Sequence, residues 1–167
     1  SLTLTTTNSA GNTSVPSDAF EFSVDTTAPL RPVLNSVNDN QGPVTGDLLN
    51  NQATNDATPT LSGSAEPNST LNIFDNGSLV ATIDVPASGT WSWTPTTPLT
   101  DSTHAFTMNA TDAAGNVSAT TPAFTITVDT AAPNQPSPIT ATDSTPPNIG
   151  AITEGQQTNE TRPALSG

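Results

Sequence analysis

The residues best suited to chemistry in this chain are carboxylates and amides placed at turns. The chain has 15 Asp and Glu against two Arg, with one His and no Cys, and its formal net charge is −13. Calcium takes about six to eight oxygen ligands from carboxylates, amides, backbone carbonyls and water. Disulfides, thiolate sites and His/Cys zinc clusters are excluded by composition. Calcium is therefore the cofactor that the residue types favour.

The same composition leaves little room for catalysis. His104 is the single histidine and stands in line with Phe106 and Met108 on an expected strand, which indicates a partly buried structural histidine. A Ser-His-Asp triad would have to use it, and no Gly-x-Ser-x-Gly elbow accompanies it. No pair of carboxylates is singled out for glycoside hydrolysis. We expect no enzyme activity and no small-molecule substrate.

The charge also restricts the partners. A polyphosphate backbone and an anionic membrane surface would both repel this chain, so no nucleic acid partner is expected. No apolar run is long enough to insert into a bilayer. Solubility and repulsion between copies would account for part of the acidity. Charged residues are only 10% of the chain, however, and several acids stand at turns, which favours sites over a diffuse acidic surface.

The elements that must position these carboxylates repeat along the chain. Residues 24–29 (Val-Asp-Thr-Thr-Ala-Pro) return as residues 128–133 (Val-Asp-Thr-Ala-Ala-Pro), 104 residues later, and no gap interrupts the register. An internal repeat of this size indicates domains in tandem. We expect residues 1–25 to be the last strands of one repeat, 26–129 a complete repeat, and 130–167 the beginning of a third.

Within a repeat, short segments rich in Thr, Val, Ile and aromatic residues alternate with turn signals such as Asn76-Gly77. This spacing predicts an all-β fold, an immunoglobulin-like β-sandwich. Residues 38–57, and 142–161 after them, are expected to be long loops. The expected strands are two within residues 2–24, then 33–37, 58–65, 69–74, 78–85, 90–94, 103–111 and 117–128, and finally 162–167.

The expected core faces inward from these strands. Trp91 and Trp93 share one face and are interpreted as core residues, although an exposed pair would be a stacking platform for sugars. That alternative would make the chain a carbohydrate-binding accessory module of a secreted hydrolase. The inward set is Leu61, Leu71, Ile73, Ile83, Trp91, Trp93, Phe106, Met108, Phe124, Ile126 and Val128.

The expected topology gathers acidic residues at both ends of the complete domain. The simplest alternative for any one of them is a turn Asp bonded to its own backbone, but like charges held close together favour a cation. The N-terminal candidates are Asp25, Glu66, Asp112 and Asn116. The C-terminal candidates are Asp39, Asn40, Asp56, Asp101 and Asp129, with Asp143 in the third unit.

These motifs resemble a known family. Residues 111–116 with 128–133, and residues 38–43 with 58–67, are similar to bacterial immunoglobulin-like tandem repeats of giant adhesins. Those adhesins include RTX-type and biofilm-associated proteins exported by type I secretion. The resemblance implies a calcium-rigidified extender at the bacterial cell surface, which holds distal ligand-binding domains for adhesion and has neighbouring repeats as its partners.

The pattern is not uniform along the chain. The departures are Asn8 in place of Asp112, Ser144 in place of Asn40 and Glu160 in place of Asp56. Asparagine offers an oxygen without a charge, so the site at the first repeat is expected to be weaker.

Overall fold

The computed structural model describes residues 1–147 and 149–167, and these residues form two compact units, Ser1–Thr130 and Ala131–Gly167. No described residue is helical, so none belongs to a helix long and apolar enough to span a membrane. The predicted all-β class is confirmed. The first unit holds β1 (Val33–Asp39), β2 (Gly46–Asp47), β3 (Gln52–Thr54), β4 (Thr60–Ser64), β5 (Thr70–Asp75), β6 (Ser78–Asp84), β7 (Thr90–Trp93), β8 (Thr103–Thr111) and β9 (Phe124–Val128).

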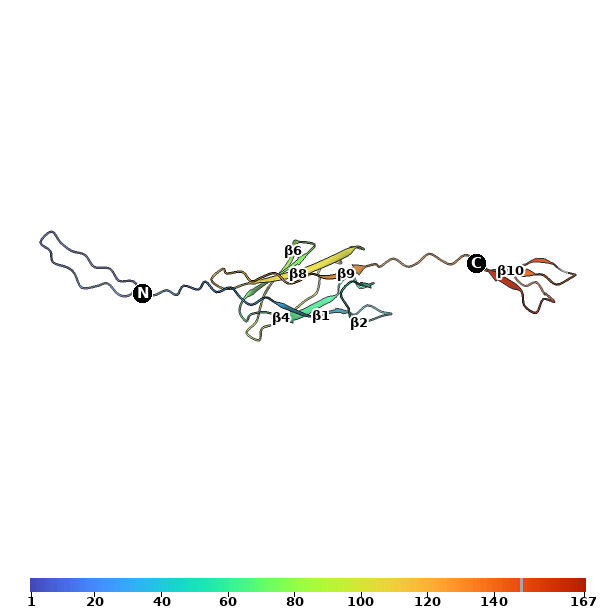
Figure 1. Ribbon diagram of the computed structural model, residues 1–167, viewed down its shortest axis with the longest axis horizontal. Coiled ribbons are helices and arrows are strands. Elements are labelled where there is room, and N and C mark those ends of the chain that lie inside the picture. Colours follow the sequence, from blue (N-terminus) through green and yellow to red (C-terminus); the bar gives the residue numbers. More distant parts are fainter. Residues whose placement is uncertain (148) are drawn as a thin grey trace. The chain divides into compact units, whose positions relative to one another are not determined.

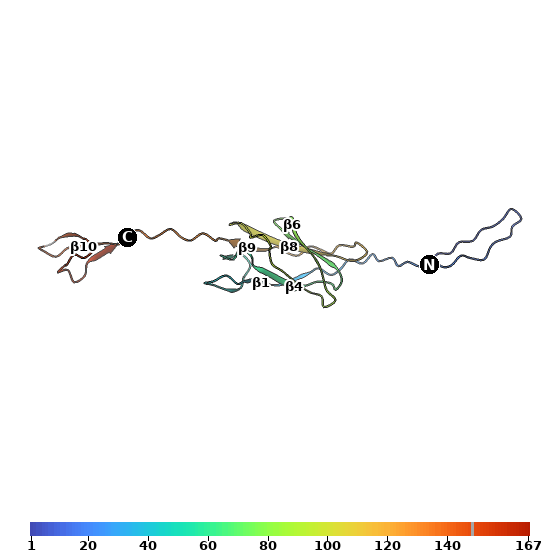
Figure 2. The ribbon, with the colours of Figure 1, turned by 180° about the vertical axis from the view of Figure 1, so that it is seen from behind.

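These nine strands form two sheets that face each other (Figures 1 and 2). One sheet has the order β2-β1-β4-β7 and the other the order β3-β9-β8-β5-β6. All neighbours are antiparallel except β3 and β9, which run parallel. The arrangement is the expected immunoglobulin-like sandwich.

The core lies between the sheets because successive strand residues point to opposite faces. Strand β8 shows this alternation along its whole length: His104, Phe106, Met108 and Ala110 are buried while the residues between them are partly exposed. Most of the predicted inward set is buried. Ile83, Trp93 and Phe124 are only partly buried, and they pack around the edge of the core.

The prediction of a structureless loop over residues 38–57 is wrong. The loop contains β2, which pairs with β1, and β3, which pairs with β9. Leu48 is buried between them, 7% exposed. Strands of two and three residues carry no period of their own, so only their distant partners define them.

The predicted strand over residues 117–128 is shorter than expected, since β9 begins at Phe124. In the preceding segment, hydroxyls replace ladder bonds: Ser118 Oγ accepts from the Ala110 N–H at 2.9 Å, and Thr121 Oγ1 accepts from the Met108 N–H at 3.0 Å. Ser and Thr side chains compete with regular backbone pairing in this way.

The β5–β6 hairpin turns as predicted at Asn76 and Gly77, whose φ angles of 48° and 81° are typical of the favoured hairpin turn. The turn is fastened to β8. The Asn76 backbone N–H donates to the Ala105 carbonyl and its side-chain amide to the Thr103 carbonyl, both at 3.0 Å. The β5–β8 ladder places Asp75, at the end of β5, opposite Phe106, and the two turn bonds continue this attachment.

Residues 2–24 form a hairpin without regular strands, contrary to the prediction. Only the isolated bridges Leu2–Phe20 and Thr7–Thr13 connect its two arms, and its large apolar side chains are exposed. A lone hairpin without a third strand or a second sheet is marginal. The bridges nevertheless stand 104 residues before the pairs Phe106–Phe124 and Thr111–Val117.

The second unit reproduces the beginning of the complete domain. Its strands are β10 (Thr140–Asp143), β11 (Gly150–Ile152) and β12 (Ala164–Ser166), where a single strand over 162–167 was expected. The central strand β10 pairs with β11 and β12 in the register in which β1 pairs with β2 and β4, shifted by 104 residues. The repeat therefore determines backbone pairing as well as sequence.

Candidate functional site

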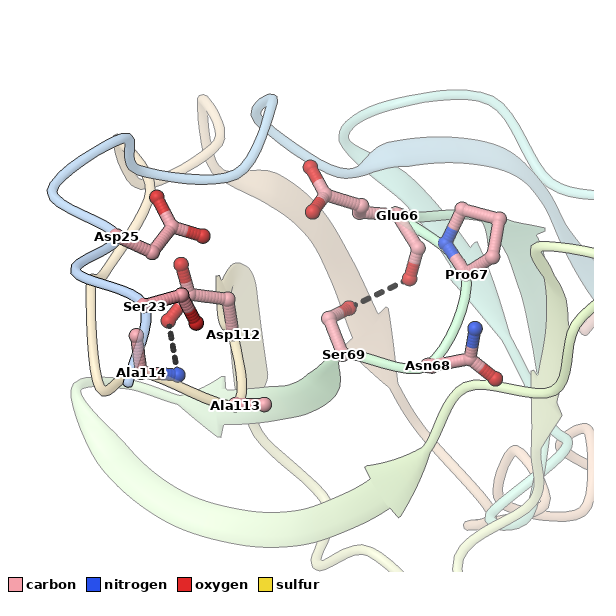
Figure 3. A pocket seen from close by; sticks show the side chains of 9 residues that line it. All are labelled: Ser23, Asp25, Glu66, Pro67, Asn68, Ser69, Asp112, Ala113 and Ala114. Atoms are coloured by element: carbon pink, nitrogen blue, oxygen red, sulfur yellow. Dashed lines mark hydrogen bonds between the residues drawn. The ribbon is translucent and has the colours of Figure 1, made fainter. Parts of the chain in front are cut away.

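Three of the predicted N-terminal carboxylates line one cavity. Asp25 comes from the connector before the sandwich, Glu66 from the turn between β4 and β5, and Asp112 from the turn after β8 (Figure 3). The cavity has a volume of about 460 Å³. Residues as far apart in the chain as Asp25 and Asp112, 87 positions, thus line one cavity where the chain joins the domain.

Asp112 organises its own turn. Its Oδ1 accepts from the backbone N–H groups of Ala114 and Asn116 at 2.9 and 2.8 Å, and its Oδ2 accepts from Asn116 Nδ2 at 2.8 Å. The Asn116 side chain and then these backbone donors lower the pKa of Asp112. Asn116 Nδ2 also donates to the Asp25 carbonyl at 3.1 Å. This amide is a direct link between connector and domain.

The first repeat provides an internal comparison for this turn. Asn8, in the place of Asp112, accepts through Oδ1 from the N–H groups two and four residues further on, both at 3.0 Å. The backbone bonds from residue 8 to 12 also match those from residue 112 to 116. A neutral amide therefore builds the same turn, and the charge of Asp112 is not needed for its shape.

The donor set at this cavity suits a hard cation such as calcium, because three carboxylates and the hydroxyls of Ser23 and Ser69 offer oxygen ligands. The three side chains line the cavity without converging. Over residues 1–147 and 149–167, no group of three or more His, Cys, Asp or Glu side chains is close enough to hold a metal ion as it stands. Asp25 and Glu66 are exposed. A cation there would have to draw the connector and the β4–β5 turn together.

At the C-terminal end, Asp39 and Asp56 are buried, 4% and 3% exposed, and both accept hydrogen bonds from the long loop itself. Asp39 accepts from Thr54 Oγ1 at 2.6 Å and from the Gln41 N–H at 2.8 Å. Asp56 accepts from the N–H groups of Asn40 at 3.1 Å and Thr58 at 2.8 Å. Protein donors thus occupy the two carboxylates that the sequence suggested for a cation.

The third unit repeats this network. Asp143, 3% exposed, accepts from Thr158 Oγ1 at 2.5 Å and from the Thr145 N–H at 2.8 Å. Glu160 stands in for Asp56 and accepts from Ser144 Oγ at 2.6 Å. The Ser144 hydroxyl, then the Thr145 hydroxyl and the Arg162 N–H, lower the pKa of Glu160 to about 2.

The remaining C-terminal candidates hold the outgoing connector. Asp101 accepts from the Thr130 N–H at 3.1 Å and from Thr130 Oγ1 at 2.9 Å. Asp129 donates its N–H to the Thr54 carbonyl at 2.9 Å. It lines a cavity of about 400 Å³ together with Asp39. Asp39 and Asp129 are therefore brought together, while Asp101 is paired with the connector.

One polar cluster was not predicted as a unit. His104, 5% exposed, places Nδ1 2.6 Å from Asp75 Oδ2 and Nε2 2.9 Å from the Thr100 carbonyl oxygen. The sequence placed His104 on the inward face of β8, and the structure confirms that. Asp75 is 29 residues away and reaches it because β5 pairs with β8, with Asp75 opposite Phe106.

Ser102, His104 and Asp75 stand in the order of a hydrolase triad, with Ser102 Oγ 3.2 Å from His104 Nε2. The chemistry of a triad needs Nε2 to accept the serine proton. Here Nε2 faces the Thr100 carbonyl, which only accepts, so Nε2 carries a hydrogen. The arrangement fits a polar clamp better than a nucleophile with its base.

The tryptophans are not presented as a flat platform. Trp91 is 4% exposed and belongs to the core. Trp93 is partly buried, with its ring edge-on to Phe106 at a centroid distance of 6.3 Å. Sugar-binding platforms need exposed aromatic faces. This burial favours the interpretation of both residues as structural.

Two facing sheets with mostly antiparallel strands, closed at each end by polar loops, define an immunoglobulin-like β-sandwich. Residues 32–130 match the family described as the bacterial Ig-like domain, and the chain belongs to this family. Domains of this family commonly occur in extracellular or surface proteins. Among curated proteins, no sequence matches this chain.

Proposed function

We propose that this chain is a non-enzymatic extender segment of a bacterial surface adhesin, and that calcium stiffens its N-terminal junction. In this role the domain supplies length and stiffness, and it transmits force between neighbouring repeats of the same chain. The protein is secreted to the cell surface by a type I route, where the array holds distal binding domains away from the cell for adhesion or biofilm formation.

The observation that carries the proposal is the anchoring of both connectors at the two ends of β8. Before the domain, the Asp25 carbonyl accepts from Asn116, just beyond the end of β8. After it, Thr130 donates to Asp101, just before the start of β8. A strand of this length spans about 30 Å. Tension on the connectors is thus passed along the longest strand of the sandwich.

Calcium would act on the first of these anchors. Asp25 belongs to the connector, whereas Glu66 and Asp112 belong to the domain, so a shared cation would join the two parts. Without a counter-ion, three carboxylates around one cavity repel each other. Extracellular sites of this kind bind calcium at about 10⁻⁴–10⁻³ M. At one hundred times the dissociation constant, binding stabilises the joined state by about 2.7 kcal/mol.

Substitution of Asp112 by asparagine is expected to weaken calcium binding about tenfold or more, because one of three charges is removed at short range. The variant is suited to this test because Asn8 already builds the same turn. Calcium titration calorimetry measures the affinity. Small-angle scattering on a protein with two or more complete repeats should then show calcium-dependent lengthening, blunted in Asp112→Asn.

Asp47→Asn is the matched control, because Asp47 is exposed and lies in the long loop at the other end of the sandwich. It makes the same change of charge and should leave the affinity of the N-terminal site unchanged. Equal stiffness in calcium and in chelator would remove calcium from the mechanism. The anchored connectors would then describe a passive spacer.

A further inference from the structure

The geometry around His104 points to a proton-operated latch. We propose that His104 is held as an imidazolium that fastens segment 100–102 to the sandwich, and through it the outgoing connector at Thr130, so that loss of one proton loosens that connector. The latch lies at the opposite end of β8 from the proposed calcium site and requires no cation.

The proton count follows from the partners of the ring. A backbone carbonyl only accepts hydrogen bonds, so the contact of 2.9 Å to the Thr100 oxygen requires a hydrogen on Nε2. Nδ1 lies 2.6 Å from Asp75 Oδ2. A bare nitrogen lone pair against a carboxylate oxygen at that distance would be repulsive, so a second proton lies between them.

The surrounding charges are consistent with this state. Asp75, on β5, is the charged group in contact with the ring. The adjacent strand β9, which pairs with β8, carries no titratable residue. On the adjoining loop, the Asp101 carboxylate is engaged by Thr130. Burial alone would lower the pKa of His104, but the Thr100 carbonyl and then the Asp75 carboxylate outweigh it and raise that pKa above its ordinary value of 6.5.

Segment 100–102 connects the ring to the connector. The Thr100 carbonyl accepts the hydrogen bond from the imidazolium. The carboxylate of the next residue, Asp101, accepts hydrogen bonds from the backbone N–H and the hydroxyl of Thr130. Ser102 accepts from the Val128 N–H at 2.9 Å. When Thr100 is released, both contacts to the end of β9 lose their support.

The direction of the pH dependence follows from the raised pKa. The stabilisation from the protonated ring is complete below the ordinary pKa of 6.5 and is lost as pH rises through the higher, folded-state value. The connector is therefore held firmly in mildly acidic solution and loosens as the pH rises through the folded-state pKa of His104.

Nitrogen NMR of the imidazole tests the proton count directly, because the chain has one histidine. We expect both ring nitrogens to be protonated at pH 6.5, with a midpoint above that value. Across the midpoint, amide exchange at Val128 and Thr130 should accelerate relative to Ala65, whose N–H bonds to Gly89 at the other end. The increase in these exchange rates relative to that of Ala65 approaches about tenfold for each unit by which the pKa of His104 is raised.

Asp75→Asn should lower the histidine midpoint and move the exchange transition with it, a result that a purely structural aspartate would not produce. Asp84→Asn makes the same charge change at an exposed residue of β6 that lies level with Thr111, at the far end of β8, and should leave the midpoint unchanged. Measurement on the parent chain decides the matter even if Asp75→Asn fails to fold. A histidine midpoint at or below 6.5 in the parent chain would overturn the latch. So would amide exchange rates at Val128 and Thr130 that change with pH in the same way as the rate at Ala65.

Discussion

Replacement of Gly63 by alanine is expected to destabilise the complete domain by about 3 kcal/mol, at the upper end of the usual range for overpacking. A methyl group on Gly63 would lie 2.0 Å from the Val33 carbonyl oxygen and 2.7 Å from a ring carbon of Trp91. The oxygen is backbone and the indole is buried, so neither can move aside. Strand β1 would have to separate from β4, which is its neighbour in the sheet.

Urea unfolding followed by tryptophan fluorescence measures this loss, because Trp91 reports on the site itself. Gly42→Ala is the matched control, since nothing lies within 4 Å of a methyl group there. It should change the free energy of unfolding by less than about 0.5 kcal/mol. If Gly63→Ala were equally mild, the close contact between β1, β4 and the indole would be wrong.

Thr54→Val is expected to destabilise the domain by about 2–3 kcal/mol, because it strips two buried groups of their partner while keeping the shape of the side chain. Thr54 Oγ1 donates to Asp39 Oδ2 at 2.6 Å and accepts from the Asp56 N–H at 2.9 Å. The loss is expected to open the long loop first, so proteolysis within residues 39–57 should accelerate more than cleavage elsewhere.

Thr54→Ser retains the hydroxyl and should recover most of the stability, which separates the hydrogen bonds from the methyl group. The same digestion in calcium and in chelator tests whether a cation contributes to the loop. Because protein donors already engage Asp39 and Asp56, we expect the parent loop to resist cleavage in both. Cleavage of the parent loop only in chelator would show that a bound cation stabilises this end of the domain.

The two acidic ends of the domain therefore differ in kind. At the C-terminal end Asp39 and Asp56 are buried and accept hydrogen bonds from hydroxyl and backbone donors of the loop, so their charge stabilises the loop. At the N-terminal end Glu66 and Asp25 are exposed around a cavity, and the charge of Asp112 exceeds what its turn requires. Sequence alone treats these as similar clusters, because the number of local donors to a carboxylate depends on the folded backbone.

The features that could be predicted from the sequence are those that depend on local or periodic information. The 104-residue repeat, the all-β class, the inward face of β8 and the turn at Asn76-Gly77 all follow from spacing and residue type. That Asp25, Glu66 and Asp112 line one cavity followed from the order of loops in a sandwich, although the three carboxylates do not converge there. These features need no knowledge of distant contacts beyond the topology.

Which side chains contact each other across the fold could be seen only in the folded domain. The short strands β2 and β3 exist because β1 and β9 lie beside them. The pairs Asp39–Thr54 and Asp75–His104 join residues 15 and 29 positions apart. The local sequence around each residue does not identify its partner. Buried polar groups form hydrogen bonds with the groups that lie next to them once the sheets have assembled.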